Sequence, residues 1–337
     1  MQTSTKAAPQ RPPADAAVLP REERLHLRRP QPAVFLSRVL FLFVLLGITS
    51  AAILRSDGAL RLLFQVVQGA LFAHGVELVH QCLHRTGTGR RGVDYALGTL
   101  LSWPAGISFW HYLYWHLWHH ANNGTEEDAE SFGYTYEWLL SPVRWVRIAG
   151  FAWHLSQLQH YLTAARRMAL AVPGMLRARL RAETPAMPDT MARRIQRDYR
   201  MLTALVVLAA AASVAFRSTA AMHLWLVPLL VGYGPAHALI ELPEHFLCAR
   251  PTDDVFENTR SIRAGWLGRW YTNNNGNHVG HHYDALVPLQ KTPLLERMLA
   301  ERRPFDHFEE TYPRYYLGVL RFLWTGRPAP APPVPAI

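Results

Sequence analysis

Cysteine and lysine are scarce in this sequence, and each scarcity removes a class of protein. The 337 residues contain only Cys82 and Cys248, too few for a disulfide framework, an iron–sulfur cluster or a four-thiolate zinc site. Of 35 cationic residues only Lys6 and Lys291 are lysine, and no basic stretch with interleaved aromatic residues marks a soluble nucleic-acid-binding module. We therefore expect neither a cysteine-based redox centre nor a nucleic-acid partner.

Charged residues are also nearly missing from four long apolar stretches. The first two contain one cation each, Arg38 and Arg61, and Met201–Phe216 contains no charge. A membrane-spanning helix needs about 20 apolar residues, so the sequence predicts an all-α integral membrane protein with two transmembrane hairpins. The alternative, two buried hairpins in a soluble helical protein, is disfavoured because both would have to be apolar all round. The predicted spans are 33–54, 59–80, 200–216 and 220–240.

Most of the arginines lie outside these spans, and the loops inside each hairpin are short and carry few charges. By the positive-inside rule both termini and the segments 81–199 and 241–325 are predicted to be cytoplasmic, and these segments form a helical cap. The net charge of +10 is attributed to this topology and to anionic lipid headgroups. Residues 1–32 and the proline-rich tail 326–337 are expected to be disordered, which leaves 33–325 as one membrane domain.

Histidine is concentrated in three short patterns, each at a predicted cytoplasmic membrane face. One is H-x-x-x-H, and H-x-x-H-H occurs twice. With 17 histidines in the chain, about 0.04 occurrences of H-x-x-H-H are expected by chance, so coincidence is a poor explanation for two. We call the patterns boxes one, two and three; they comprise His80 and His84, then His116, His119 and His120, then His278, His281 and His282.

The spacing within the boxes indicates a metal site. On a helix the histidines of the first two boxes each share a face, and the third box is expected to start a helix near His278, with Asn275 or Asn277 as its cap. Eight unpaired imidazoles gathered beside a membrane would be costly to desolvate and would repel one another when protonated, whereas metal binding removes both problems. Since one ion takes four to six ligands, eight histidines imply two ions; imidazole alone does not identify the metal.

The succession of boxes on two membrane hairpins resembles the membrane fatty acid desaturase superfamily, which includes carotenoid hydroxylases and ketolases, over roughly residues 33–300. The resemblance implies that the eight box histidines are iron ligands, joined by His245 in "ELPEHFLCAR". Two departures concern neighbouring residues: Gln81 stands where many relatives have an acidic residue, and Asn277 directly precedes His278.

The resemblance also implies the chemistry. Two irons would activate O2 with external electrons, and we favour desaturation of a fatty acyl chain over hydroxylation or ketolation of a lipid or carotenoid. A separate ferredoxin, rubredoxin or cytochrome b5-like donor is expected on the arginine-bearing face, because two cysteines cannot hold a cluster. A membrane metal transporter is the non-enzyme alternative; it would place ligands at mid-membrane rather than at the ends of spans.

Four residues near the boxes are candidates for orienting the ligand rings. Glu77 lies three residues before His80 on the same helical face and could accept a ring N–H; otherwise it pairs with Arg85 or is solvated. Asp128 follows box two and has the same two interpretations, ring orientation or a solvated loop. Asn275 and Asn277 precede box three and complete the set.

Overall fold

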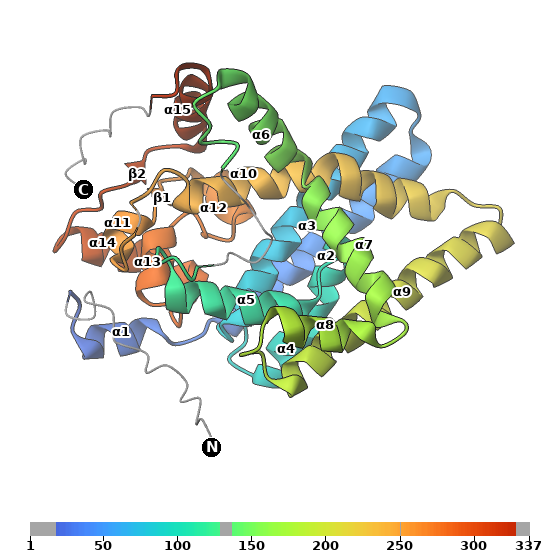
Figure 1. Ribbon diagram of the computed structural model, residues 1–337, viewed down its shortest axis with the longest axis horizontal. Coiled ribbons are helices and arrows are strands. Elements are labelled where there is room, and N and C mark those ends of the chain that lie inside the picture. The colour runs from blue at the N-terminus through green and yellow to red at the C-terminus, as the bar shows by residue number, and fades with distance from the viewer. Residues whose placement is uncertain (1–17, 129–136, 250, 328–337) are drawn as a thin grey trace.

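The computed structural model describes residues 18–128, 137–249 and 251–327, and these are almost entirely helical (Figure 1). Four helices are long and apolar enough to cross a membrane, which confirms the predicted all-α membrane architecture with two hairpins. They are α2 (Pro32–Arg55), α3 (Gly58–Leu83), α9 (Asp189–Ala215) and a continuous helix Met222–His245 made of η3 (Met222–Leu226), η4 (Leu229–Tyr233) and α10 (Gly234–His245).

The third of these helices differs most from its predicted bounds. The sequence places the start of the span at residue 200, whereas α9 begins at Asp189. The added N-terminal turns carry charged residues such as Arg193 and Arg194, which the hydropathy criterion excludes from a span but which a helix leaving the membrane tolerates. The apolar half of α9 exposes Val207, Leu208 and other large side chains. Such exposure suits contact with lipid.

The two hairpins contact each other where α3 packs against η4, and a glycine of each helix, Gly69 and Gly232, lies at this contact. A Cβ atom on Gly69 would lie 2.1 Å from the carbonyl oxygen of Pro228, and one on Gly232 would lie 2.5 Å from that of Val66. Such close approach of backbones is typical of small residues between membrane helices. The hydrogen-bond pattern is π-helical on both sides of Pro228, whose missing N–H interrupts the regular ladder.

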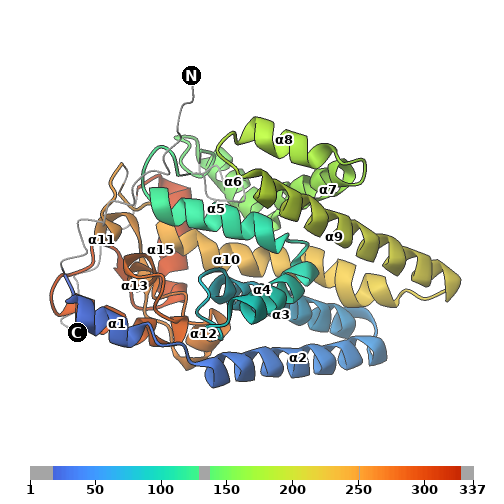
Figure 2. The same cartoon turned by 90° about the horizontal axis from the view of Figure 1, so that it is seen from below.

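The remaining elements form a cap at the end of the molecule opposite the hairpin tips (Figures 1 and 2). Within the described residues the only strands are β1 and β2, which pair in parallel over two residues each. The cap elements are α4 (Arg91–Ser102), η2 (Trp103–Ala105), α5 (Phe109–Asn122), α6 (Arg144–Ser156), α7 (Leu158–Ala171), α8 (Met175–Glu183), α11 (Val255–Asn258), β1 (Ser261–Ile262), α12 (Trp266–Tyr271), α13 (His278–Tyr283), η5 (Leu289–Lys291), α14 (Thr292–Ala300), β2 (Phe308–Glu309) and α15 (Tyr312–Thr325).

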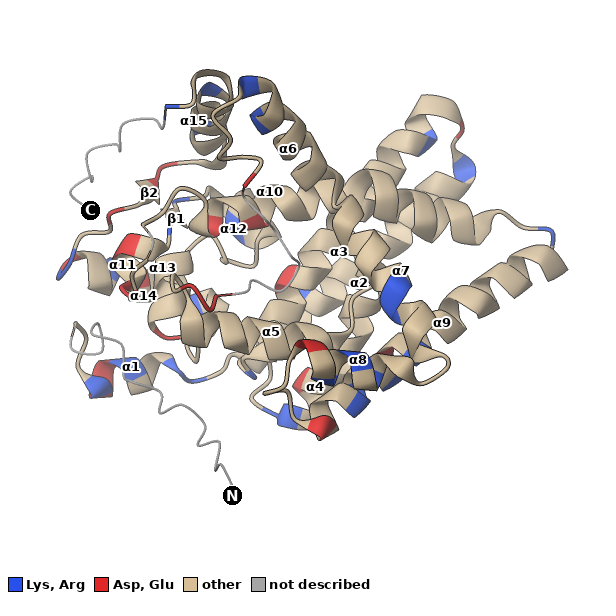
Figure 3. Cartoon of the chain, viewed as in Figure 1, with Lys and Arg blue, Asp and Glu red and all other residues tan. Residues whose placement is uncertain are grey.

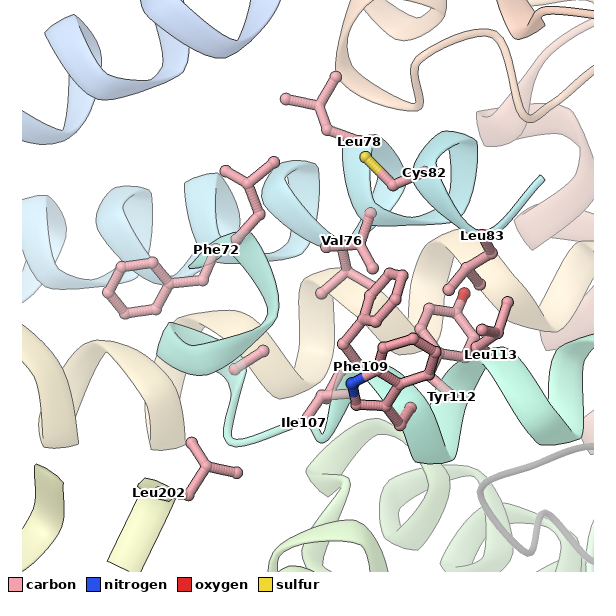
Figure 4. Close-up of a cluster of buried hydrophobic side chains, with 14 of the residues drawn as sticks. Phe72, Val76, Leu78, Cys82, Leu83, Ile107, Phe109, Tyr112, Leu113 and Leu202 are labelled. Carbon is pink, nitrogen blue, oxygen red and sulfur yellow. The ribbon is translucent and has the colours of Figure 1, made fainter. Parts of the chain in front are cut away.

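The largest apolar cluster lies where α3, α4 and α5 meet, beneath the cap (Figure 4). Phe109 is fully buried there, and a Cβ on Gly98 would lie 2.3 Å from its ring, so α4 can approach α5 only with glycine at this position. The start of α5 is also fixed to α9, because Asp198 Oδ2 accepts hydrogen bonds from Ser108 Oγ (2.9 Å) and from the Trp110 amide (3.3 Å). These contacts fix α5, the helix that carries the histidines of box two.

The N-terminal segment is more ordered than the sequence predicts. Residues 1–17 lie outside the described part, but α1 (Arg21–Leu27) follows, against the predicted disorder of residues 1–32. Leu19 and Leu27 are buried in the cluster around α13 and α14, and Arg28 pairs with Asp284 at 2.9 Å. The low hydrophobicity of this segment led to the prediction of disorder, because its contacts are with residues more than 200 positions away in the sequence. Of the predicted disordered tail, residues 328–337 also lie outside the described residues.

Charge is distributed unevenly (Figure 3). Basic residues are concentrated on α8 and the N-terminal turns of α9, at the cap end, whereas the two hairpin tips carry only a few charged residues. At α8 several arginines share one acid: Arg177, Arg181 and Arg193 all lie within 3.7 Å of Asp189. This face is therefore net positive.

Candidate metal centre

Five histidines from all three boxes form an all-imidazole group. His80 and His84 come from the end of α3, His116 and His120 from α5, and His281 from α13. One ring nitrogen of each lies within 4.8 Å of the others. The shortest Nε2–Nε2 separations are 2.8 Å (His84 to His116) and 2.9 Å (His281 to both His80 and His120).

A second, mixed group lies beside the first and contains a carboxylate. It comprises His119, His245, His278, His282 and Glu244, which two overlapping ligand triads join through His245. The Nε2 atoms of His119 and His245 are 3.2 Å apart, and those of His278 and His282 are 3.1 Å apart. Glu244 Oε2 lies 3.4 Å from His278 Nε2. The nine predicted histidines are therefore gathered into two adjacent groups.

Boxes two and three each contribute to both groups. His119 and His120 are neighbours in sequence but point to different groups, because consecutive residues on a helix are rotated by about 100°. On α13, His281 joins the all-imidazole group, while His278 and His282 join the mixed group. The H-x-x-H-H spacing thus lets one helix serve two ions, which a pair of histidines on one face could not.

The hydrogen bonds of the mixed group test whether it suits a metal. His119 Nδ1 lies 2.8 Å from Asp128 Oδ1, and His245 Nδ1 lies 3.0 Å from the carbonyl oxygen of Asn258. Both oxygens only accept, so both Nδ1 atoms carry the proton and the two facing Nε2 atoms present lone pairs. Two lone pairs at 3.2 Å repel unless a cation lies between them.

The distances themselves also suit a metal. Two ligands at right angles on one ion, with metal–nitrogen bonds of about 2.1 Å, are about 3 Å apart. The facing nitrogens of the two groups are separated by 2.8 to 3.2 Å. The donor set, neutral imidazoles with one carboxylate, fits a first-row transition metal such as iron. The residues present therefore fit the metal pair that the family resemblance implies.

Burial keeps these imidazoles neutral. It lowers the pKa of His84 to about 3, and burial followed by neighbouring histidines lowers the pKa of His116 and His120 well below 6.5. The pKa values of the three box-three histidines are lowered in the same way. A neutral ring keeps its lone pair for a metal, so the group is prepared for binding near neutral pH.

Two of the predicted orienting residues contact ligand rings. Asp128 bonds His119 and is fully buried, which excludes the solvated-loop alternative. Asn275 Oδ1 lies 3.1 Å from His278 Nδ1, and its Nδ2 donates to Glu244 Oε1 at 2.7 Å. Asn275 therefore connects an imidazole and the carboxylate of the mixed group.

The other two predicted orienting residues behave differently. Asn277 occupies the N-cap position of α13, as predicted, but its side chain donates to Glu296 Oε2 at 2.6 Å instead of capping the helix. Glu77 is buried, and within the described residues its Oε2 accepts no hydrogen bond, so it does not hold a box histidine through that atom. The alternative pairing with Arg85 is also wrong: among the described residues no ion pair joins the two side chains, and Arg85 donates from Nε to Tyr95 Oη with its guanidinium over the Tyr95 ring. The backbone turn after α3 directs Arg85 away, at a φ of 58°.

Neither Glu244 nor Glu296 was identified from the sequence as a residue of the site. Glu244 directly precedes His245, and that adjacency was a usable signal. Glu296 carried no such signal, since it lies 14 residues after His282 on α14, beyond the range of any motif. Glu296 Oε1 accepts hydrogen bonds from the Gly280 amide (3.1 Å) and from the Ser261 hydroxyl, and thereby holds the backbone of box three.

A small cavity of about 20 Å³ lies against both groups. That volume accommodates roughly one small molecule such as water or O2. His80 and His116 border it from the all-imidazole group, and His119, His278 and Glu244 from the mixed group. The remaining lining residues are Glu77, Tyr112, Glu241 and Asn275. A small ligand in this cavity would touch residues of both groups.

Fold and site together define a class: a helical membrane protein with a paired, histidine-rich metal-binding centre in its cap. A family model for fatty acid desaturase matches residues 56–314, most of the chain and all three boxes, and the chain therefore belongs to the fatty acid desaturase family. No curated protein matches the sequence. At the level of the family, membership implies an oxidoreductase and favours it over the transporter alternative.

Proposed function

We propose that this protein is an O2-dependent diiron oxidoreductase that introduces a double bond into a fatty acyl chain. One observation carries the proposal: the three boxes assemble into two adjacent, buried ligand groups within a desaturase-family fold. The ligands are the nine histidines His80, His84, His116, His119, His120, His245, His278, His281 and His282, together with Glu244. Iron bound there supplies reductive activation of O2 and removal of hydrogen from an unactivated C–H bond.

The chain's own residues orient and enclose this centre. Asp128, Asn258 and Asn275 hold the Nδ1 side of three rings in the mixed group, so the Nε2 lone pairs point inward. In the all-imidazole group α3 and α5 place the rings, and the apolar cluster beneath them keeps both helices rigid. Burial of nearly every ligand excludes bulk water, which would quench a strong oxidant.

An apolar pocket of about 410 Å³ supports a fatty acyl substrate. It lies between α7, α9 and the fourth span, and Ala105 of η2 and the following Gly106 also line it. Trp225 and Tyr161 are its largest lining residues, and their polar atoms are turned to the backbone: Trp225 Nε1 donates to Pro104 O and Tyr161 Oη to Leu229 O. The wall facing the pocket is therefore hydrocarbon, as an alkyl chain requires.

Electrons come from a separate ferredoxin, rubredoxin or cytochrome b5-like protein. The net-positive face over α8 and the start of α9 supports this part of the proposal, because an acidic donor would be steered toward it. Both termini and the metal centre are proposed to be cytoplasmic. The arginines at the cap end and the few charges at the hairpin tips support that orientation.

The test is mass spectrometry of lipids from a host that expresses the chain, compared with His281→Ala. His281 belongs to the all-imidazole group, so its loss should abolish product. The matched control is His26→Ala, because His26 is exposed on α1 and far from the centre in sequence. Species lighter by two hydrogens in the wild type and the control, but absent in His281→Ala, support desaturation. Species heavier by one oxygen instead would replace desaturation by hydroxylation.

A further inference from the structure

A second pocket, distinct from the metal centre and from the apolar pocket, lies on the cap behind box three. Its volume is about 150 Å³, enough for a phosphate-sized group. Its lining comes from the loop that follows β1, from α12, from α14 and from the segment that leads into β2, and it includes Asn277, which directly precedes the first ligand of box three. The lining residues are Arg263, Ala264, Arg269, Asn277, Pro293, Glu296, Arg297, Phe305 and Phe308.

Three arginines give this pocket its charge. Among the described residues, Arg263, Arg269 and Arg297 form no ion pair and no side-chain hydrogen bond with one another or with any acid. Glu296 is the one acidic residue of the lining, and its carboxylate is turned to Ser261, Gly280 and Asn277 rather than to the arginines. Several guanidinium groups without a counter-charge around one hollow are suited to an anion with several oxygens.

Helix α12, which supplies Arg269 to the pocket, packs against the membrane-spanning helices α2 and α3. Trp270 of α12 contacts Phe41 of α2, with ring centroids 5.6 Å apart, and His74 of α3 at 4.5 Å. On the same short helix Trp266 is 76% and Leu267 57% exposed. Exposed tryptophan and leucine beside basic residues are typical of a helix in the headgroup region of a bilayer. Figure 2 shows α12 beside the cap end of α2.

We propose that this arginine pocket binds the phosphate of the molecule that carries the acyl chain to the metal centre. The inference rests on the proposed function, since it takes an acyl carrier as the substrate. A phospholipid headgroup and the phosphate of a soluble acyl thioester share the required chemistry. A phosphate bound by the arginines would lie near Asn277, whose side chain donates to Glu296 and which directly precedes the first ligand of box three. Binding would therefore bring the carrier close to the helix that bears the box-three ligands.

The experiment measures binding directly on the full-length, iron-loaded protein in neutral detergent by native mass spectrometry. The probes are dioleoyl phosphatidylglycerol and, separately, oleoyl-coenzyme A. The variant replaces all three pocket arginines by glutamine: Arg263→Gln, Arg269→Gln and Arg297→Gln. Affinity for at least one probe should fall by about tenfold or more, the loss expected for one charge-assisted hydrogen bond. Which probe loses affinity identifies the source of the phosphate.

The matched control removes three positive charges outside the pocket, on α7, α8 and α15, by Arg166→Gln, Arg179→Gln and Arg321→Gln. This control should bind both probes as the wild type does. If the triple pocket variant does not fold, as judged by its iron content and elution volume, the single reversal Arg297→Glu on the exposed side of α14 provides the same comparison. Unchanged affinity for both probes in a folded pocket variant, or equal losses in pocket and control variants, would overturn the proposal.

The outcomes separate this inference from the proposed function. Pocket-dependent binding without any unsaturated product in the host would leave the phosphate site standing and refute desaturation. Product formed by the wild type, with binding and product unchanged in the pocket variant, would leave the function standing and refute the site.

Discussion

The two ligand groups of the centre differ in composition and in how their rings are held. The all-imidazole group has five neutral rings, placed mainly by the long helices α3 and α5. The mixed group includes Glu244, and three of its rings are fixed by Asp128, Asn258 and Asn275. A carboxylate ligand lowers the net charge of a metal site, and hydrogen bonds at Nδ1 raise the basicity of a ring. Two iron ions bound in these groups, as we propose, should therefore be chemically inequivalent.

The largest expected effect comes from separating the neighbours His119 and His120. Either change to alanine should abolish activity, because the proposed reaction needs both irons. His120→Ala should empty the all-imidazole group and His119→Ala the mixed group, so each variant keeps a different single iron. Mössbauer spectra of the 57Fe-loaded variants should each lose a different one of the two wild-type signals. Loss of the same signal in both would contradict the division into two groups.

A smaller effect is expected when only the support of a ring changes. Asp128→Asn removes the charge that orients His119 but keeps the shape of the side chain. Outer hydrogen-bond partners of metal ligands typically contribute about 10- to 100-fold in affinity or activity. In a chelator titration the iron affinity of the mixed group should fall by an amount within that range, while the affinity of the all-imidazole group stays unchanged. The control Asp198→Asn, beneath α5, should not lower the affinity of one group more than that of the other. Equal iron loss from both groups would mean that Asp128 only stabilises the fold.

Glu296 supports both groups at once, because α13 carries ligands of each. Glu296→Ala leaves the Gly280 amide and the Asn277 side chain without their acceptor and opens a gap beside Gly280. Leaving buried donors unsatisfied costs about 1–3 kcal/mol, so thermal unfolding in detergent should occur at lower temperature. Glu296→Gln retains one acceptor and should lie between alanine and wild type. A melting temperature unchanged in the alanine variant would refute this role.

The smallest effect concerns His160, a buried histidine outside both groups. Burial lowers its pKa from 6.5 to about 4, so the unfolded chain binds a proton more readily than the folded one between these values. The contribution of neutral, buried His160 to the free energy of unfolding is therefore fully present above pH 6.5 and is lost as the pH falls toward 4. Between pH 7 and pH 5 the wild type should lose about 1–2 kcal/mol more than His160→Gln. Parallel melting curves for the two proteins over this range would contradict the assignment.

Local sequence patterns predicted the four spans and the three boxes because both depend on short-range spacing. The family resemblance implied His245 as an additional ligand, and in the structure this residue ends α10 and belongs to the mixed group. The role of Glu296 depends on α14 packing against α13, which no sequence spacing encodes, whereas Glu244 could have been inferred from its adjacency to His245. The docking of Leu19 and Leu27 on the cap was missed for the same reason. Periodicity indicates which side of a helix is apolar, but it does not specify what packs against it.

The most direct test of the paired centre is metal analysis of the purified full-length chain by inductively coupled plasma mass spectrometry, with iron and zinc quantified against protein. We expect two irons per chain in the wild type and in the His26→Ala control, and one in His119→Ala and in His120→Ala. A single tightly bound ion per wild-type chain, or zinc in place of iron, would contradict the diiron centre on which the proposed function rests.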